Sequence, residues 1–229
     1  MNRPLFYLLC VCISALIGCQ SRNAQPPQKP LTGNGRTVIE YRQRVNGYQV
    51  EAELIDINTD WPMAMSSALL HFRKDDEKCF TVFVDWFGDP SITAEVLLAH
   101  KGMRYVTDYE PADDPYLASN SPFYFADMDF DGRDELVIVE WLCGRGLANM
   151  YDVYAVEDYY ADRITSPPFD YIEKNTTTFI PEKKQIVNFF ANIWESERYV
   201  YERVDNLNEG YFYSYGPGFV LKSLEKSEN

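Results

Sequence analysis

Histidine is scarce in this sequence: only two are present among 229 residues, His71 and His100. Neither belongs to an H-E-x-x-H motif, and both stand in stretches where apolar residues alternate, so we expect strand residues rather than catalytic bases. A G-x-S-x-G nucleophile motif is also missing. These absences argue against the common hydrolase sites and favour a protein without catalysis. A glycan hydrolase built on two carboxylates stays open, with Asp85, Glu140 and Asp158 as candidates.

Positive charge is the second shortage. Lys and Arg together number 21 against 35 for Asp and Glu, which gives a formal net charge of -14 and a pI near 4.5. A surface of this sign repels phosphate groups and releases none of their counterions, so nucleic acid is excluded as a partner. Cations and basic proteins are the partners that this charge favours.

Long apolar runs are missing as well. The longest one, Leu5–Ile17, follows Arg3 and is too short for a settled transmembrane helix, which needs about 20 residues. A basic start, a short apolar middle and a small residue at the end are typical of an export signal. Outside this segment and Cys19 only Cys79 and Cys143 remain, both at the ends of predicted strands. In an oxidising compartment they form either a disulfide or two buried thiols.

The end of the export signal reads Leu16-Ile17-Gly18-Cys19. This quartet resembles the lipobox of bacterial lipoproteins. The resemblance implies that residues 1–18 are a removed signal peptide and that Cys19 becomes the acylated first residue. Gln20 stands where an inner-membrane retention signal would place Asp, which favours the outer membrane. The alternative is an ordinary secretory signal that leaves Cys19 as a thiol. Residues 19–36, rich in Gln, Asn, Pro and Gly, are predicted to form a flexible tether.

Residues 37–229 are predicted to form a single β domain. Short runs rich in Val, Ile, Tyr and Phe alternate with turn residues, and Asn46-Gly47 is the clearest tight turn. About ten strands are expected, and residues 61–70 are the best candidate for a helix. This pattern predicts a mostly β protein, an antiparallel meander folded into a β-sandwich or a partly open barrel. The runs interpreted as strands are 37–45, 48–57, 67–74, 79–87, 94–102, 135–142, 151–160, 184–194, 198–205, 210–216 and 218–225.

The most informative stretch, FADMDFDGRDELVIVEW, spans residues 125–141. It sets carboxylates at alternate positions, allows a sharp turn at Gly132 and then enters an apolar strand. Hard oxygen ligands of this kind suit Ca²⁺, and an EF-hand is excluded because the twelfth loop position is Ile138. The alternative is a polar turn that binds no ion. The predicted ligands are the carboxylates of Asp127, Asp129, Asp131 and Glu135 and the carbonyl oxygen of Arg133; Asp134 falls between ligand positions.

This loop resembles the D-x-D-x-D-G-x-x-D/E calcium loops of FG-GAP repeats. The longer stretch 122–158 resembles a family of bacterial calcium-loop envelope lipoproteins, related in fold to the periplasmic inhibitors of invertebrate-type lysozyme. The resemblance is carried by an aromatic lead (123–125), the acidic loop (127–135), an apolar strand (136–141), a loop with Gly and Asn (144–149) and a Tyr-rich strand (151–158). It implies a non-enzymatic β domain that binds Ca²⁺ and a partner in the cell envelope.

A partner loop follows from the same resemblance. Inhibitory relatives present a Ser-Gly pair where this chain has Cys143 and Gly144. The sequence therefore predicts a membrane-tethered binding module for an envelope protein, which the negative charge suggests is basic. An inhibitor of a lysozyme-like enzyme and a glycan or peptidoglycan hydrolase are the alternatives. The residues expected on the partner loop are Gly144, Arg145, Gly146, Asn149 and Tyr151.

Overall fold

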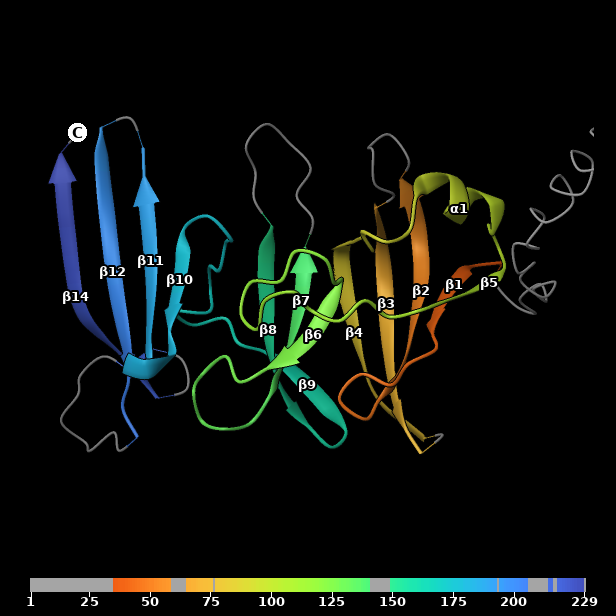
Figure 1. Ribbon diagram of the computed structural model, residues 1–229, viewed down its shortest axis with the longest axis horizontal. Helices are drawn as coiled ribbons and strands as arrows, with labels where there is room; N and C mark the ends of the chain where they lie inside the picture. Colours follow the sequence, from red (N-terminus) through yellow and green to blue (C-terminus); the bar gives the residue numbers. More distant parts are fainter. Residues whose placement is uncertain are drawn as a thin grey trace, which may run out of the picture.

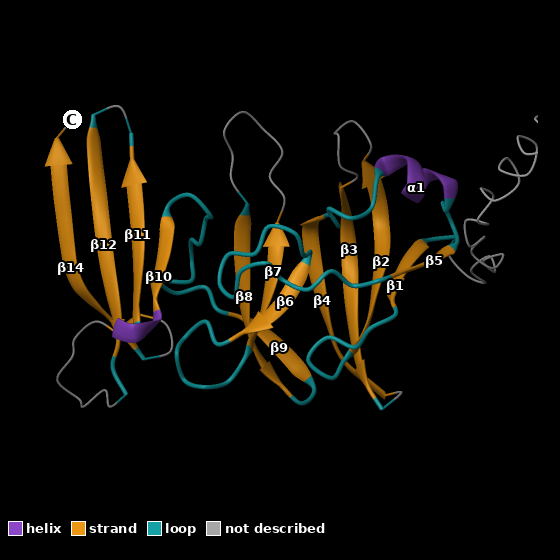
Figure 2. Cartoon of the chain, in the orientation of Figure 1, coloured by secondary structure: helices purple, strands orange, loops and turns teal. Residues whose placement is uncertain are grey.

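The chain is built almost entirely of β-strands. Within the described residues there are fourteen strands, one α-helix and one 3-10 helix (Figure 2). The strands form three open sheets, none of which closes into a barrel. The predicted β class is therefore confirmed, in the form of stacked sheets. The computed structural model describes residues 35–58, 65–75, 77–140, 149–192, 194–205, 214–215 and 218–228.

The first sheet has the strand order β4-β3-β2-β1-β5. The pairs β1–β2, β2–β3 and β3–β4 are antiparallel, as expected of a meander, but β5 pairs with β1 in parallel. The expected meander is thus broken at this edge of the sheet. The strands are β1 (Thr37–Tyr41), β2 (Gln49–Asn58), β3 (Met65–Lys74), β4 (Glu77–Phe87) and β5 (Arg104–Thr107).

The middle and third sheets follow along the chain. The middle sheet is an antiparallel meander of β6 (Phe123–Ala126), β7 (Glu135–Glu140), β8 (Met150–Glu157) and β9 (Tyr160–Arg163). The third sheet has the order β10-β11-β12-β14-β13. Its elements are β10 (Thr177–Ile180), the 3-10 helix η1 (Pro181–Lys183), β11 (Gln185–Ala191), β12 (Glu195–Arg203), β13 (Ser214–Tyr215) and β14 (Phe219–Glu228).

The three sheets follow one another along the long axis of the molecule, with the middle sheet between the other two (Figure 1). One apolar cluster joins the first sheet to the middle sheet and contains Leu136 and Ile138 of β7. A second cluster joins the middle sheet to the third and contains Val137 and Val139 of the same strand. Side chains of a strand point alternately to its two faces, so β7 is buried on both sides. This explains why its sequence is a continuous apolar run.

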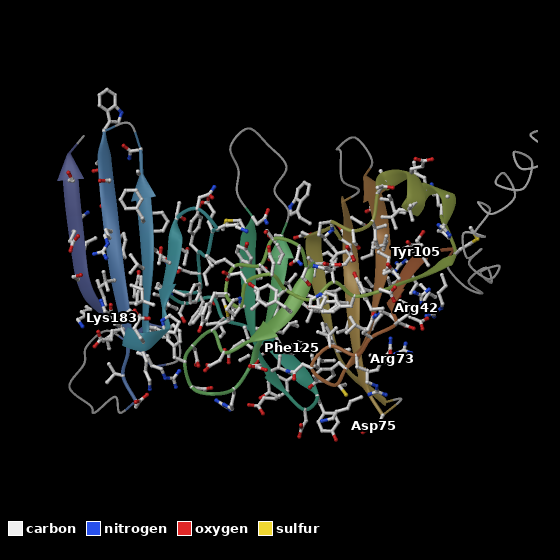
Figure 3. The ribbon with its side chains drawn as sticks, viewed as in Figure 1. Arg42, Arg73, Asp75, Tyr105, Phe125 and Lys183 are labelled. Atoms are coloured by element: carbon white, nitrogen blue, oxygen red, sulfur yellow. The ribbon has the colours of Figure 1, made fainter. Side chains whose placement is uncertain are left out.

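Side chains fill the spaces between the sheets (Figure 3). Phe125, labelled there, packs against the first cluster beside Tyr48 and Phe72. The third sheet supplies Ile186, Tyr201 and Phe219 to the second cluster. The acidic loop between β6 and β7 therefore belongs to the middle sheet, which packs against an apolar cluster on each of its two faces.

The Asn46-Gly47 turn is confirmed. Both residues have positive φ, 49° and 83°, as the tight type I′ turn requires. Val45 and Tyr48 on either side exchange two backbone hydrogen bonds of 2.9 Å. Asn and Gly tolerate this left-handed backbone better than other residues, so the dipeptide defines the hairpin locally.

Two local predictions are wrong. Met65–Leu70, the described part of the predicted helix at 61–70, belongs to β3, which is paired on one side with β2 and on the other with β4. The predicted strand at 94–102 contains α1 (Ala94–Ala99), where the Thr93 hydroxyl accepts a hydrogen bond from the backbone N–H of Val96 at 3.3 Å. Sheet pairing outweighed helix propensity in the first segment, and a capped run of Ala, Glu and Leu formed the helix in the second. None of the helices in the described part of the chain has the length and apolar character needed to span a bilayer.

Candidate metal centre

The acidic loop connects β6 to β7 and alternates acidic with apolar residues. Met128 and Phe130 are buried in the second apolar cluster, which anchors the loop in the core. Phe130 and Gly132 both have positive φ, 63° and 88°, so the chain reverses sharply at these two positions. Glycine is suited to this conformation because it has no Cβ. The reversal returns the chain so that Glu135 pairs with Ala126 across the sheet.

Backbone N–H groups of the loop orient its carboxylates. Glu135 Oε2 accepts hydrogen bonds from the N–H groups of Met128 at 2.8 Å and Asp129 at 3.3 Å. Asp127 accepts from Asp131 N–H and from Gly132 N–H at 2.9 and 3.0 Å. Asp129 Oδ1 accepts from Asp131 N–H at 3.0 Å. The loop thus holds its own acidic side chains in defined positions.

Three of the predicted ligands come together. One carboxylate oxygen each from Asp127, Asp129 and Glu135 lies within 4.8 Å of the others. Calcium binds oxygens at about 2.3–2.6 Å, so oxygens on opposite sides of one ion are roughly 5 Å apart. The donors are hard carboxylate oxygens, which suit Ca²⁺ or Mg²⁺ better than a soft metal. The triad therefore fits a hard divalent cation.

Burial makes the triad dependent on positive charge. Asp129 and Glu135 are only 4% and 7% exposed. Burial, with the charges of Asp129 and Asp131 adding to it, raises the pKa of Glu135 to about 8. Burial also raises the pKa of Asp129, against the opposing effect of the Arg203 guanidinium. A bound cation would favour the ionised form of both groups, because opposite charge stabilises it.

Asp131 and Arg133 lie beside the triad and contact each other. The Asp131 carboxylate accepts hydrogen bonds from the backbone N–H of Arg133 at 2.8 Å, and from its Nε and Nη2 at 3.0 and 2.7 Å. Burial acts to raise the pKa of Asp131, but these contacts outweigh it and the pKa is lowered. Asp131 is therefore paired with Arg133 and is not one of the three grouped carboxylates. The ligand roles of Asp131 and of the Arg133 carbonyl oxygen stay predictions. Asp134, placed outside the ligand set, is exposed.

A basic residue that the sequence did not point to completes the surroundings. Arg203, the last residue of β12, donates from Nη1 to the backbone carbonyl of Asp129 at 2.6 Å, and this nitrogen lies 2.7 Å from Asp129 Oδ2. Arg203 Nη2 is 4.0 Å from Asp131 Oδ2. The Arg203 side chain is 15% exposed, so the pair is largely removed from water. A separation of 74 residues hides this contact from any local sequence pattern.

Only two residues of the predicted partner loop, Asn149 and Tyr151, belong to the described part of the chain. Gly144, Arg145 and Gly146 lie outside the described residues. Tyr151 is buried in the second cluster, and its hydroxyl donates to the carbonyl of Ala118 at 2.9 Å, so its ring belongs to the core rather than to a contact surface. The Asn149 carbonyl accepts from Lys174 N–H at 3.1 Å.

Of the cysteines named in the predictions, Cys79 is described, whereas Cys19 and Cys143 are not. Cys79 lies on β4 and is half-buried. Cys143 lies outside the described residues, so the choice between a disulfide and two thiols stays open. The signal peptide 1–18, Cys19 and the tether as far as residue 34 are also outside them.

The histidines occupy structural positions. His71 is a residue of β3, as predicted, and its ring nitrogens contact Thr81 Oγ1 at 2.9 Å and Glu53 Oε2 at 3.3 Å. His100 is not in a strand: it caps the C-terminus of α1, and its Nδ1 is 2.7 Å from the carbonyl oxygen of Val96.

The carboxylates considered for hydrolysis do not form one group. Burial, followed by the charge of Asp152, raises the pKa of Glu140 to about 7, and Asp85 adds to this effect. Asp158 follows the end of β8, whereas Glu140 pairs with Met150 at the start of that strand. Glu140 thus has Asp152 and Asp85 as acidic neighbours, while Asp158 lies at the other end of the sheet.

Comparison with known proteins yields little. No family model and no curated protein matches this chain. Among solved structures, it is similar to a Xanthomonas type IV secretion system related protein with a TM-score of 0.48 and 11% sequence identity, over 88% of this chain and 92% of the other.

Proposed function

We propose that this protein is a calcium-binding β module that acts by binding a partner in the bacterial cell envelope and has no catalytic activity of its own. The observation that carries the calcium site is the Asp127, Asp129 and Glu135 triad, whose oxygens lie within 4.8 Å of one another. The spacing D-x-D-x-D-G-x-x-E, typical of calcium loops, supports the same metal.

The charge balance of the loop favours a divalent ion. Apart from the exposed Asp134, the turn has four carboxylates, which together carry four negative charges when Glu135 is ionised. Two of them face guanidinium groups: Asp131 faces Arg133, and Asp129 faces Arg203. The excess of two negative charges is what one Ca²⁺ neutralises. Oxygen-only donors suit Ca²⁺, which accepts varied coordination geometries, better than Mg²⁺, which needs a stricter octahedron and keeps more of its water.

The position of the loop supports a structural role for the cation. Met128 and Phe130 lie in the apolar cluster between the middle and third sheets, and Glu135 begins the strand that is buried on both faces. A cation here would hold a turn on which the packing of two sheets depends. A cation at this location would stabilise a surface that binds a partner. The tether and the lipid anchor that we propose at Cys19 would hold this surface in the cell envelope.

Direct titration of the purified full chain tests the calcium site. After removal of metals with chelator, calorimetry with Ca²⁺ should show one site with a dissociation constant of about 10⁻⁴ to 10⁻³ M, the range of extracellular modules. Mg²⁺ should bind more weakly. Absence of a calcium isotherm, together with an unchanged melting temperature, would show the loop to be a polar turn.

The absence of catalysis is tested separately. Incubation of the protein with purified peptidoglycan should release no soluble fragments, either in calcium or in chelator. Release of fragments that is abolished by Glu140→Gln would instead establish the hydrolase alternative, because Glu140 has the raised pKa that a general acid requires.

A further inference from the structure

Arg203 joins two parts of the molecule that are far apart in the sequence. Its backbone is fixed in the third sheet, where its N–H donates to the carbonyl of Lys184 at 2.9 Å and the residue pairs with Phe219 of β14. Its side chain leaves that sheet and reaches the acidic loop of the middle sheet. The residue therefore connects the candidate cation site to the third sheet directly.

The contact fixes both the main chain and the side chain of Asp129. Nη1 lies 2.6 Å from the Asp129 carbonyl oxygen and 2.7 Å from its Oδ2. On its other oxygen, Oδ1, Asp129 accepts the N–H of Asp131. The carboxylate is thus held from two sides, in the rotamer that places one oxygen in the triad. The fixed plane of the guanidinium holds Nη1 at both acceptors of Asp129 while Nη2 lies 4.0 Å from Asp131 Oδ2, an arrangement that a single ammonium nitrogen does not reproduce.

Arg203 is positioned for this contact at some energetic disadvantage. Within the described part of the chain its Nε is buried without a hydrogen bond, and Asp205 Oδ1, at 3.6 Å, is too far to accept one. A buried N–H donor without an acceptor costs free energy, so the favourable contacts of the guanidinium must be made by its other nitrogens. They lie at Asp129.

We propose that Arg203 is a positioning residue which couples occupancy of the cation site to the docking of the third sheet on the middle sheet. This inference rests on the proposed calcium site. Arg203 holds Asp129 ready for the cation, so binding orders less of the loop. In return, a bound cation relieves the repulsion among the carboxylates and fixes the loop to which Arg203 is attached. Coupling between two such equilibria is reciprocal, so each strengthens the other by the same factor.

The experiment compares Arg203→Gln with the wild-type full chain. Calorimetry should show calcium affinity reduced about tenfold, within the usual range of coupling between sites. Amide hydrogen exchange in β11 and β12 should slow by a similar factor when calcium is added to the wild type, and should respond little to calcium in the variant. Arg198→Gln is the matched control, because Arg198 lies on the same strand in an exposed pair with Glu225 at 3.4 Å. It should behave as the wild type.

The outcomes separate this inference from the calcium site itself. If the wild type binds no calcium, the proposed function fails and the coupling with it. If the wild type binds calcium and Arg203→Gln binds it equally or more tightly, the coupling is wrong and the calcium site stands. Arg203→Lys, measured in parallel in case the Gln variant does not fold, should fall between the two. Coupling of wild-type strength in Arg203→Lys would overturn the two-point contact.

Discussion

Asp129 shows at the scale of one residue how the loop depends on positive charge. Its carboxylate is almost fully buried, belongs to the triad and faces Arg203. Burying an ionised group without a partner is strongly unfavourable. The Arg203 contact partly compensates Asp129, and a bound cation would balance the charges of Asp127 and of ionised Glu135.

Replacing Asp129 should therefore remove the response to calcium. At about 100 times its dissociation constant, calcium should add about 2.7 kcal/mol to the free energy of unfolding of the wild type. Asp129→Ala should lose this increment, whereas Asp134→Ala, at an exposed position outside the triad, should keep most of it. Thermal melts of each protein in chelator and in excess calcium measure the increment. Because Asp129→Ala also removes the carboxylate that faces Arg203, the difference between the two conditions is the readout. Equal increments in both variants would contradict the assigned ligand set.

The raised pKa of Glu135 predicts a pH dependence. Its pKa is 4.5 in the unfolded chain and about 8 in the folded protein without cation, so between these values the folded state binds more protons. The unfolding free energy of the calcium-free protein should then fall as pH rises from about 4.5 to 8, at up to about 1.4 kcal/mol per pH unit from this group. Calcium should reduce the fall, since it favours the carboxylate.

Denaturant titrations at several pH values in chelator and in calcium measure this slope. Glu135→Gln removes the titrating group while keeping an oxygen acceptor for Met128 N–H, so it should flatten the curve in chelator. A slope of the same size in Glu135→Gln and in the wild type would place the proton uptake elsewhere.

At the scale of elements, β7 differs from the strands of the outer sheets. Neighbouring residues Val137 and Ile138 are both fully buried, one in each apolar cluster. On β4, an edge strand of the first sheet, Val82 is buried at 4% exposure and Phe83 is exposed at 52%. The two pairs thus distinguish a strand covered on both faces from one covered on a single face.

Alanine substitutions should reveal this difference. Ile138→Ala should destabilise by about 2–5 kcal/mol, and Val137→Ala by somewhat less because fewer methyl groups are removed. Val82→Ala should also destabilise, but Phe83→Ala should change stability by about 0.5 kcal/mol. Denaturant midpoints provide the measurement. A large loss for Phe83→Ala would contradict the exposure of this side chain.

The element predictions succeeded where local signals were strong. Runs such as 48–57 and 198–205 have the alternation of strands, and Asn46-Gly47 has the backbone preferences of its turn. Short strands such as β5 and β9, four residues each, were not predicted because so few residues give no clear period. The helix at Ala94–Ala99 was mistaken for a strand, since its apolar residues are too few to distinguish the two periods.

At the scale of the whole molecule, the lipid anchor that we propose at Cys19 would hold the protein at the membrane. Cys19→Ser removes the thiol that would carry the lipid, so the variant should leave the membrane pellet and appear in the soluble envelope fraction. Fractionation followed by detection of the protein measures this. The wild type is the reference, and Cys79→Ser, which changes a cysteine outside the signal, is the matched control. A Cys19→Ser variant that still pellets with membranes would contradict the anchor.

The sequence by itself determined the properties that depend on neighbouring residues. The β class follows from alternation, the hairpin from Asn46-Gly47, and the acidic loop from the spacing of Asp127, Asp129 and Glu135 around Gly132. These signals are local, because strand period, turn conformation and loop ligands are all defined within about ten residues of chain.

Only the tertiary structure decided which groups face one another across the sheets. It buried Tyr151 in the core and brought Arg203 to Asp129 from the third sheet. It also showed that the apolar run of β7 divides between two clusters. Such contacts depend on how three sheets stack, and a local pattern carries no information about partners that lie many strands away.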